Sequence, residues 1–242
     1  GATPLFTNSG NTLGRGYATD IALGDLDGDG DLDALITDKT NGDSVWINDG
    51  DGHFSEDDQP LVYSDAVALG DIDGDGDLDA VTGGNVGRVW ENEGGVLGNT
   101  GQSLTFDSTD VALGDLDDDG DLDAVMPSNA TSPAHSVWLN DGTGAFSNNG
   151  ETIPIDTDRQ SVALGDLDGD GDIDAFVARS NHANAIWTND GTGHFNYTAG
   201  TVGTGGNRDA ELADLNGDGH LDAVVAKETG AGNEVWINDG SG

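Results

Sequence analysis

Apolar and polar positions alternate over short stretches along the whole chain, and each stretch ends at Gly, Asn or Asp. No stretch shows the i, i+3, i+4, i+7 apolar spacing of an amphipathic helix. Short alternating runs bounded by turn-forming residues are typical of β-strands joined by tight turns. The pattern therefore predicts an all-β protein without helices.

These short strands recur in a repeated unit. A first strand, such as residues 20–24, precedes an aspartate-rich stretch, and a second strand, such as residues 33–36, follows it. A third strand carries a Val-Trp or Ile-Trp pair. The Asn-Asp-Gly behind this pair in several units indicates a hairpin, because these residues tolerate positive φ. A fourth strand is expected around Phe54, Phe146 and Phe195.

The unit occurs five times, and the first Asp of each aspartate-rich stretch is Asp25, Asp71, Asp115, Asp166 or Asp214. Four short antiparallel strands in a unit of this length are typical of a β-propeller blade. A solenoid, the alternative repeat architecture, would need distinct capping repeats at its ends.

The two ends of the sequence favour a closed ring. The last unit stops where its fourth strand should begin, and residues 3–13, which include Phe6, match no other part of the first unit. We therefore predict a single domain over residues 1–242: a five-bladed β-propeller with four-stranded antiparallel blades, in which the N-terminal strand completes the last blade.

Composition excludes several classes of function. The chain has 47 acidic against 7 basic residues, a formal charge of −40, so it lacks the basic surface that nucleic acid or an anionic membrane requires. No apolar stretch is long enough to insert into a membrane. The absence of cysteine excludes disulfides, thiolate metal sites and cysteine nucleophiles.

The aspartate-rich loop has the form Asp-x-Asp-x-Asp-Gly-x-x-Asp, illustrated by residues 25–33. Carboxylates crowded at positions 1, 3, 5 and 9 repel each other unless a hard cation neutralises them. Calcium accepts six to eight oxygen ligands, and glycine at position 6 permits a sharp turn. Magnesium retains its water ligands, and zinc prefers nitrogen or sulfur, so calcium fits best.

An EF-hand is excluded, because it requires Glu at position 12 and flanking helices. The equivalent residues here, such as Ile36 and Val225, lie in predicted strands. The nonapeptide of calcium-binding β-rolls is also absent.

These repeated loops resemble the FG-GAP/VCBS repeats, which build the calcium-bearing propeller of integrin α subunits. Such repeats recur in bacterial surface proteins, fungal lectins and accessory modules of polysaccharide-degrading enzymes. The resemblance covers all five units, although the literal Phe-Gly and Gly-Ala-Pro signatures are missing. It implies that the loop joins the first and second strands of a blade. It further implies that positions 1, 3, 5 and 9 bind calcium through side chains, and position 7 through its carbonyl.

Mapping the motif predicts about five calcium ions, one in each of the loops 25–33, 71–79, 115–123, 166–174 and 214–222. The fifth site should be weaker, because Asn216 replaces a carboxylate there. The expected metal-binding residues are Asp25, Asp27, Asp29, Asp31 and Asp33; Asp71, Asp73, Asp75, Asp77 and Asp79; Asp115, Asp117, Asp119, Asp121 and Asp123; Asp166, Asp168, Asp170, Asp172 and Asp174; and Asp214, Asn216, Asp218, His220 and Asp222.

No catalytic motif stands out beside these loops. We therefore expect a non-catalytic, monomeric adhesion or ligand-binding module, secreted or on the cell surface, in which calcium is structural. Its ligand, a glycan or a protein, is expected on the face opposite the calcium loops. Two alternatives remain: an accessory or minimal module of a polysaccharide-degrading enzyme, and a recently amplified or engineered repeat scaffold without its own ligand. The five Trp-containing strands are expected to pack between blades rather than to stack on sugars.

Overall fold

The computed structural model describes residues 8–104, 107–128, 137–150, 160–228 and 232–240. Its regular structure is all β, in nineteen strands that form five antiparallel sheets, hereafter blades 1 to 5. No helix of the described residues could span a membrane.

Blade 1 contains β1 (Ala18–Gly24), β2 (Asp33–Asp38), β3 (Ser44–Asn48) and β4 (Phe54–Asp57), and blade 2 contains β5 (Ala66–Gly70), β6 (Asp79–Gly83), β7 (Arg88–Asn92) and β8 (Leu97–Ser103). Blade 3 contains β9 (Ala112–Gly114), β10 (Asp123–Val125), β11 (Val137–Asn140) and β12 (Phe146–Asn148), and blade 4 contains β13 (Gln160–Gly165), β14 (Asp174–Arg179), β15 (Asn184–Asn189) and β16 (Phe195–Val202). Blade 5 contains β17 (Asn207–Ala213), β18 (Asp222–Lys227) and β19 (Glu234–Trp236).

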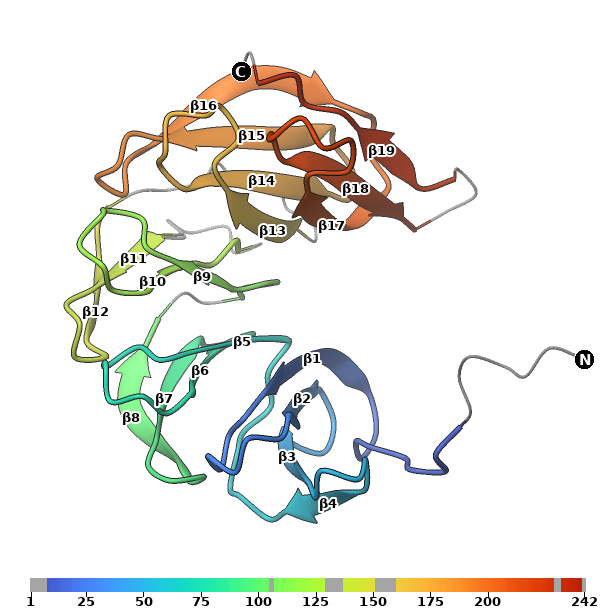
Figure 1. Cartoon of the computed structure of the whole chain (residues 1–242), viewed down its shortest axis with the longest axis vertical. Helices are drawn as coiled ribbons and strands as arrows, with labels where there is room; N and C mark the ends of the chain where they lie inside the picture. The colour runs from blue at the N-terminus through green and yellow to red at the C-terminus, as the bar shows by residue number, and fades with distance from the viewer. Residues whose placement is uncertain (1–7, 105–106, 129–136, 151–159, 229–231, 241–242) are drawn as a thin grey trace, which may run out of the picture.

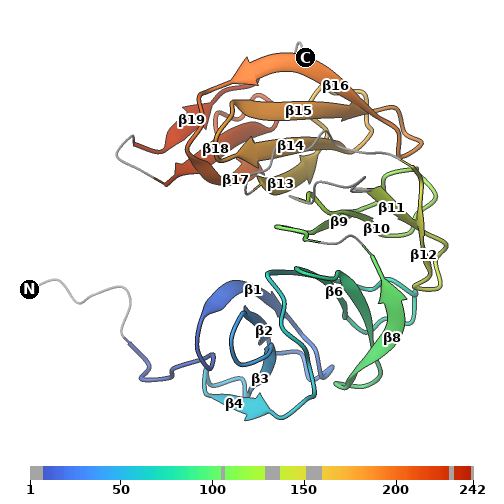
Figure 2. The ribbon, with the colours of Figure 1, turned by 180° about the vertical axis from the view of Figure 1, so that it is seen from behind.

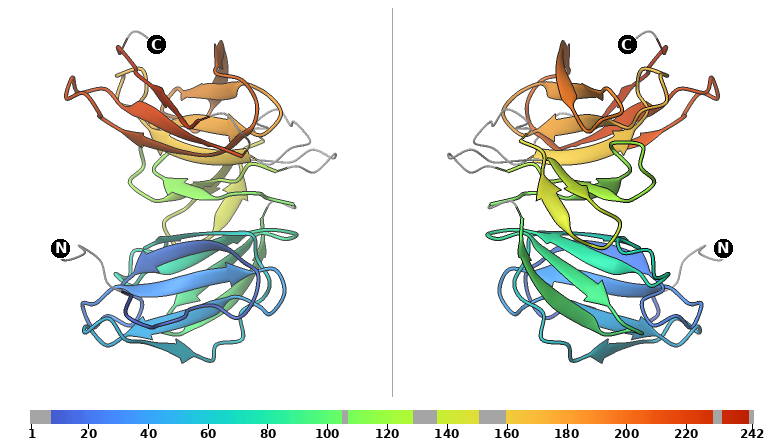
Figure 3. Two further views of the ribbon diagram at one scale, coloured as in Figure 1. Left: turned by 90° about the vertical axis from the view of Figure 1, so that its right-hand side faces the viewer. Right: turned by 90° about the vertical axis from the view of Figure 1, so that its left-hand side faces the viewer.

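The blades follow one another in sequence order around a common centre, toward which the first strand of each blade lies (Figures 1 and 2). In the side views the strands run across the molecule, and the loops that connect them lie at its two ends (Figure 3). A central cavity of about 290 Å³ is lined by residues of all five blades, among them Asp20, Ala66, Asp110, Ser161 and Asp209. The predicted five-bladed β-propeller is confirmed.

Each blade packs on the next through a glycine at the end of its first strand. A Cβ atom on Gly24 would lie 2.6 Å from a methyl carbon of Leu78 in blade 2, closer than real Cβ contacts allow. Gly70, Gly114 and Gly165 receive leucine or isoleucine side chains of the following blade in the same way. The small residue therefore permits the close approach of neighbouring sheets.

The hydrophobic core lies between the blades rather than at the centre of the molecule. Four clusters of buried side chains join blades 1 and 2, 2 and 3, 3 and 4, and 4 and 5. Trp90 and Trp187 belong to two of these clusters, as the sequence predicted for the Trp-containing strands. Spreading the apolar residues over thin interfaces explains how a chain with so few of them builds a core.

Carboxylates near the central cavity also join neighbouring blades. Asp20 accepts a hydrogen bond of 3.0 Å from the backbone N–H of Val67, and Asp110 accepts one of 2.8 Å from Val162. Burial raises the pKa of Asp110 to about 7 despite these backbone donors.

Blade 5 has three strands within the described residues, in the order β17-β18-β19. The prediction that residues 3–13 supply its fourth strand falls partly on residues 1–7, which lie outside the described residues. Residues 8–13 form no strand. Completion of blade 5 by the N-terminal strand therefore stays a prediction.

Candidate metal sites

Each aspartate-rich loop joins the first two strands of its blade, and its ninth residue is the first residue of the second strand. Since consecutive strands are antiparallel, all five loops lie at the same end of the propeller. The connections between second and third strands lie at the opposite end.

The ninth aspartate anchors the loop to the sheet. Asp33 is fully buried, and its two carboxylate oxygens accept hydrogen bonds from the backbone N–H groups of Leu26 (2.9 Å) and Asn48 (2.8 Å). The same pair of bonds recurs in the other four blades at Asp79, Asp123, Asp174 and Asp222. This carboxylate therefore ties the start of the loop to the end of the third strand.

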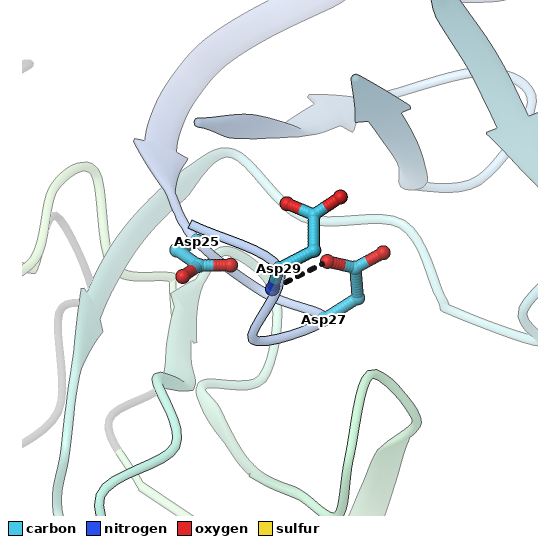
Figure 4. A group of neighbouring side chains, drawn as sticks. All are labelled: Asp25, Asp27 and Asp29. Atoms are coloured by element: carbon cyan, nitrogen blue, oxygen red, sulfur yellow. Dashed lines mark hydrogen bonds between the residues drawn. The ribbon is translucent and has the colours of Figure 1, made fainter. Parts of the chain in front are cut away.

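The first, third and fifth residues shape the turn itself. In the first loop Asp25 accepts hydrogen bonds from the N–H groups of Gly28 (2.9 Å) and Gly30 (3.0 Å). Asp27 accepts one from the N–H of Asp29 at 3.2 Å. Figure 4 shows these three carboxylates gathered on a single turn of the chain. The backbone thus wraps around its own acidic side chains and holds them on one side.

Carboxylate oxygens converge in four of the five loops. In each of these four loops, three aspartates each contribute one oxygen, and the three oxygens lie within 4.8 Å of one another. The groups are Asp25, Asp27 and Asp29; Asp71, Asp73 and Asp79; Asp115, Asp117 and Asp123; and Asp166, Asp168 and Asp174. Such clusters of oxygen donors could hold a hard metal ion.

The fifth loop forms no such group among the described residues. Asn216 stands at its third position, and its amide nitrogen donates a hydrogen bond of 2.9 Å to Asp218. Donation by the backbone N–H groups of Gly217 and Gly219 lowers the pKa of Asp214. The fifth loop therefore differs from the others at its third position, and the expectation that its site is weaker stays a prediction.

The side chain at the seventh position lies close to the hairpin glycine of its blade and belongs to none of the four converging groups. Asp31, Asp121 and Asp172 lie against the hairpin glycines Gly50, Gly142 and Gly191, and the ring of His220 lies against Gly240 in the same way. In the second loop Asp77 instead accepts a hydrogen bond of 3.0 Å from the N–H of Gly94. These side chains connect the loop to the hairpin of the same blade.

The third loop carries two buried carboxylate oxygens that have no hydrogen-bond partner, one on Asp115 and one on Asp117. A buried carboxylate oxygen without a donor is unfavourable unless a cation compensates it. These oxygens belong to two of the three residues that converge in this loop. The residues present therefore fit a bound cation.

The raised pKa values of several loop carboxylates support a bound cation. Burial, reinforced by neighbouring aspartates, raises the pKa of Asp123 to about 6. The pKa values of Asp27, Asp117, Asp168 and Asp174 are raised for the same reasons. Without a cation the fold holds these groups where their negative charge is unfavourable.

Position 4 of the loop requires a left-handed backbone, and the third loop breaks the glycine pattern there. Asp118 has φ of 60°, whereas Gly74 at the same position has φ of 77°. We expect Asp118→Gly to raise the free energy of unfolding by about 0.5–1 kcal/mol, because glycine adopts this region without strain. Urea denaturation in excess divalent cation measures the change.

Gly74→Asp is the reciprocal control, and it should lower the free energy of unfolding by a similar amount. If Asp118→Gly is neutral while Gly74→Asp is destabilising, side-chain hydrogen bonds of Asp118 must offset its backbone strain, and the prediction is wrong.

Comparison with known proteins agrees with this geometry. The model of the FG-GAP-like repeat family matches residues 25–82, 129–177 and 166–225, which together make up more than half of the chain. A comparison with curated proteins found no match.

Two solved structures are similar in fold. The first is an Agrocybe aegerita lectin that specifically recognises non-reducing terminal N-acetylglucosamine. It has a TM-score of 0.55 and 21% sequence identity, and the match covers 91% of this chain and 66% of that chain. The protein thus spans just under two thirds of the lectin's length. The second is BBS1N in complex with ARL6DN, with a TM-score of 0.49, 14% identity, and coverage of 88% of this chain and 77% of that one.

Proposed function

The chain belongs to the FG-GAP-like repeat family, and we propose that it is a non-catalytic, calcium-binding β-propeller that acts outside the cell as a ligand-binding module. In this proposal calcium stabilises the scaffold, and a glycan is the ligand. The convergence of three carboxylates in four equivalent loops is the observation that carries it.

The choice of calcium follows from the donor set. The converging groups offer carboxylate oxygen alone, and calcium tolerates several such ligands in irregular geometry. Magnesium demands near-octahedral geometry and gives up its waters reluctantly. Extracellular modules bind calcium with dissociation constants of about 10⁻⁴–10⁻³ M, which suits loops on an exposed rim. FG-GAP-like repeats are typical of extracellular proteins, and this supports a secreted or cell-surface location.

The opposite end of the propeller is the proposed ligand face. Every lysine and arginine of the described residues lies there, next to the starts of first and third strands or the ends of second strands: Arg15, Lys39, Arg88, Arg179, Arg208 and Lys227. Lys39 and Arg208 also line the mouth of the central cavity. The metal loops thus concentrate negative charge at one end and leave mixed charge at the other.

Two exposed tyrosines mark this face. Tyr17 directly precedes β1 and Tyr63 lies three residues before the start of β5, at equivalent positions of the repeat. Their rings offer apolar surface next to a hydroxyl group, a combination that suits the faces and edges of sugar rings. The Agrocybe aegerita lectin of similar fold recognises non-reducing terminal N-acetylglucosamine, which makes glycans the first ligands to test.

A glycan array probed with labelled protein, in calcium and in EDTA, tests the proposal. We expect binding in calcium to a limited set of glycans and loss of that binding in EDTA. Tyr63→Ala should weaken binding at least about tenfold, the effect of losing one well-placed contact, without changing the melting temperature. Tyr197→Ala, at another exposed tyrosine on outer strand β16, is the matched control and should bind normally.

If the labelled protein binds no glycan on the array, either in calcium or in EDTA, the proposal of a glycan ligand is contradicted. Release of reducing ends from polysaccharides by the purified protein would contradict the non-catalytic assignment.

A further inference from the structure

A second group of buried carboxylates lies at the end of blade 1 opposite its aspartate-rich loop. Asp38 ends β2 and Asp43 directly precedes β3, and the two residues are 1% and 3% exposed. Ser64, two residues before β5, is 2% exposed. The backbone N–H groups of Asp38 (2.9 Å) and Ser64 (3.0 Å) both donate to Oδ1 of Asp43. The three residues therefore lie side by side around the Asp43 carboxylate.

Each of the two carboxylates uses one oxygen and leaves the other without a partner. Oδ1 of Asp38 accepts hydrogen bonds from the N–H groups of Thr40 (2.7 Å) and Asn41 (2.9 Å), as Oδ1 of Asp43 does from its own two donors. The Oδ2 atoms of both aspartates and the hydroxyl oxygen of Ser64 have no hydrogen-bond partner within the described part of the chain. Buried oxygens of this kind are unfavourable unless a cation or a donor compensates them.

The two basic residues in and next to blade 1 are engaged elsewhere. Nζ of Lys39 pairs with Asp65 at 2.8 Å, and Arg15 pairs with Glu56 and Asp58. These ion pairs leave the buried carboxylates without a positive side chain of their own blade.

Both carboxylates are charged at neutral pH. Burial raises the pKa of Asp43 to about 6, and the neighbouring charge of Asp38 adds to this effect. Burial acts in the same direction on Asp38, but hydrogen bonds from Thr40 and Asn41 outweigh it and lower the pKa of Asp38. Above a pH of about 6 the pair therefore holds two adjacent negative charges.

Blades 4 and 5 differ from blade 1 at the equivalent positions. Asn184 and Asn233 stand where blade 1 has Asp43, and they accept the same hydrogen bond from the N–H groups of Arg179 (3.4 Å) and Lys227 (3.2 Å). These two basic residues occupy the position of the first aspartate of the pair, since each lies at the end of the second strand, in β14 or β18. The backbone contact therefore needs no carboxylate, and blade 1 alone of the three places two negative charges there.

We propose that Asp38, Asp43 and Ser64 form a further cation site, which binds calcium between the two Oδ2 atoms and the hydroxyl oxygen. Two carboxylates balance the charge of a divalent ion, and calcium accepts both carboxylate and hydroxyl oxygen. The ion joins the connection between β2 and β3 to the segment before β5. The site lies outside the five aspartate-rich loops and does not depend on the identity of the proposed ligand.

Asp43→Asn tests the site, because it gives blade 1 the amide of blades 4 and 5 and removes one proposed metal ligand. Equilibrium dialysis against radioactive calcium at physiological ionic strength counts the ions bound at saturation. We expect this variant to bind about one calcium ion fewer per chain than the parent protein. Asp65→Asn is the charge-matched control, since Asp65 pairs with Lys39 instead, and it should bind as many ions as the parent.

Melting temperatures provide a second readout, in which the effect of Asp43→Asn changes sign. In EDTA the variant should melt at least as high as the parent, because asparagine keeps the acceptor oxygen, as Asn184 does, and removes a negative charge beside Asp38. In calcium it should melt about 5–10 °C below the parent, since only the parent gains the binding energy of this ion.

An unchanged calcium count in Asp43→Asn would overturn the proposal and would mean that a proton compensates the two carboxyl groups. The proposal also fails if Asp65→Asn loses as much calcium, or if Asp43→Asn melts above the parent in both solutions. Should Asp43→Asn not fold, Ser64→Ala removes only the hydroxyl group. This variant should need at least about threefold more calcium to reach the same occupancy, and an unchanged calcium affinity would contradict the site.

Discussion

Excess EDTA is expected to lower the melting temperature of this protein by roughly 10–20 °C. One site filled at a hundredfold excess over its dissociation constant stabilises the folded state by about 2.7 kcal/mol, because the unfolded chain does not bind the ion. Each kcal/mol moves the melting temperature of a domain of this size by about 2–4 °C. The stated shift therefore needs only two of the four loops with converging carboxylates to be occupied.

Differential scanning calorimetry at matched ionic strength measures this shift. Returning calcium in excess over the chelator should restore the original transition, and the same concentration of magnesium should restore less of it. An unchanged transition in EDTA would show that the loops are stable without an ion, and the proposal of structural calcium would fail.

Asp79→Asn is expected to destabilise the protein by about 1–3 kcal/mol even in EDTA. The carboxylate of Asp79 is fully buried and accepts hydrogen bonds from the backbone N–H groups of Ile72 (2.9 Å) and Asn92 (2.7 Å). An amide offers only one oxygen, so one of these N–H groups would lose its acceptor and face the NH₂ group instead. Urea denaturation in EDTA isolates this structural contribution from metal binding.

Asp73→Asn in the same loop is the matched control. Asp73 accepts one hydrogen bond of 3.1 Å from the N–H of Asp75, and Asn216 already makes the equivalent bond in the fifth loop. In EDTA this variant should therefore unfold at nearly the same urea concentration as the parent protein. In calcium both variants should show weaker metal binding. Equal destabilisation of the two variants in EDTA would mean that the ninth position has no special structural role.

The repeat made much of the fold predictable. The Val-Trp pairs, the Asn-Asp-Gly turns and the five aspartate-rich stretches placed three strands of every unit correctly, because each depends on interactions within a few residues. Departures from the pattern were equally visible, since Asn216 and Asp118 stand where other loops have aspartate and glycine. Both loops differ from their neighbours in the structure.

The candidate sites were predictable only in part. The sequence identified the acidic residues of each loop. It did not show that the ninth residue anchors the loop to the sheet while the seventh contacts the hairpin. The ninth aspartate anchors the loop through backbone N–H groups that come from a different strand, such as that of Asn48. The seventh side chain braces a hairpin that lies about twenty residues further along the chain, as Asp31 does at Gly50. Such contacts depend on how strands are brought together, which residue spacing does not specify.

The sequence by itself determined the repeating unit, its strands and the acidic loop, because backbone conformation and local charge repulsion act over a few neighbouring residues. Only the tertiary structure decided which repeat positions are packed between blades. Leu23 and Val235, at the two ends of the row, are exposed, whereas their repeat equivalents Leu69 and Val45 are partly buried and buried in the cluster between blades 1 and 2. Burial is a property of the packed neighbours of a side chain, so identical repeat positions acquire different environments once the blades are assembled.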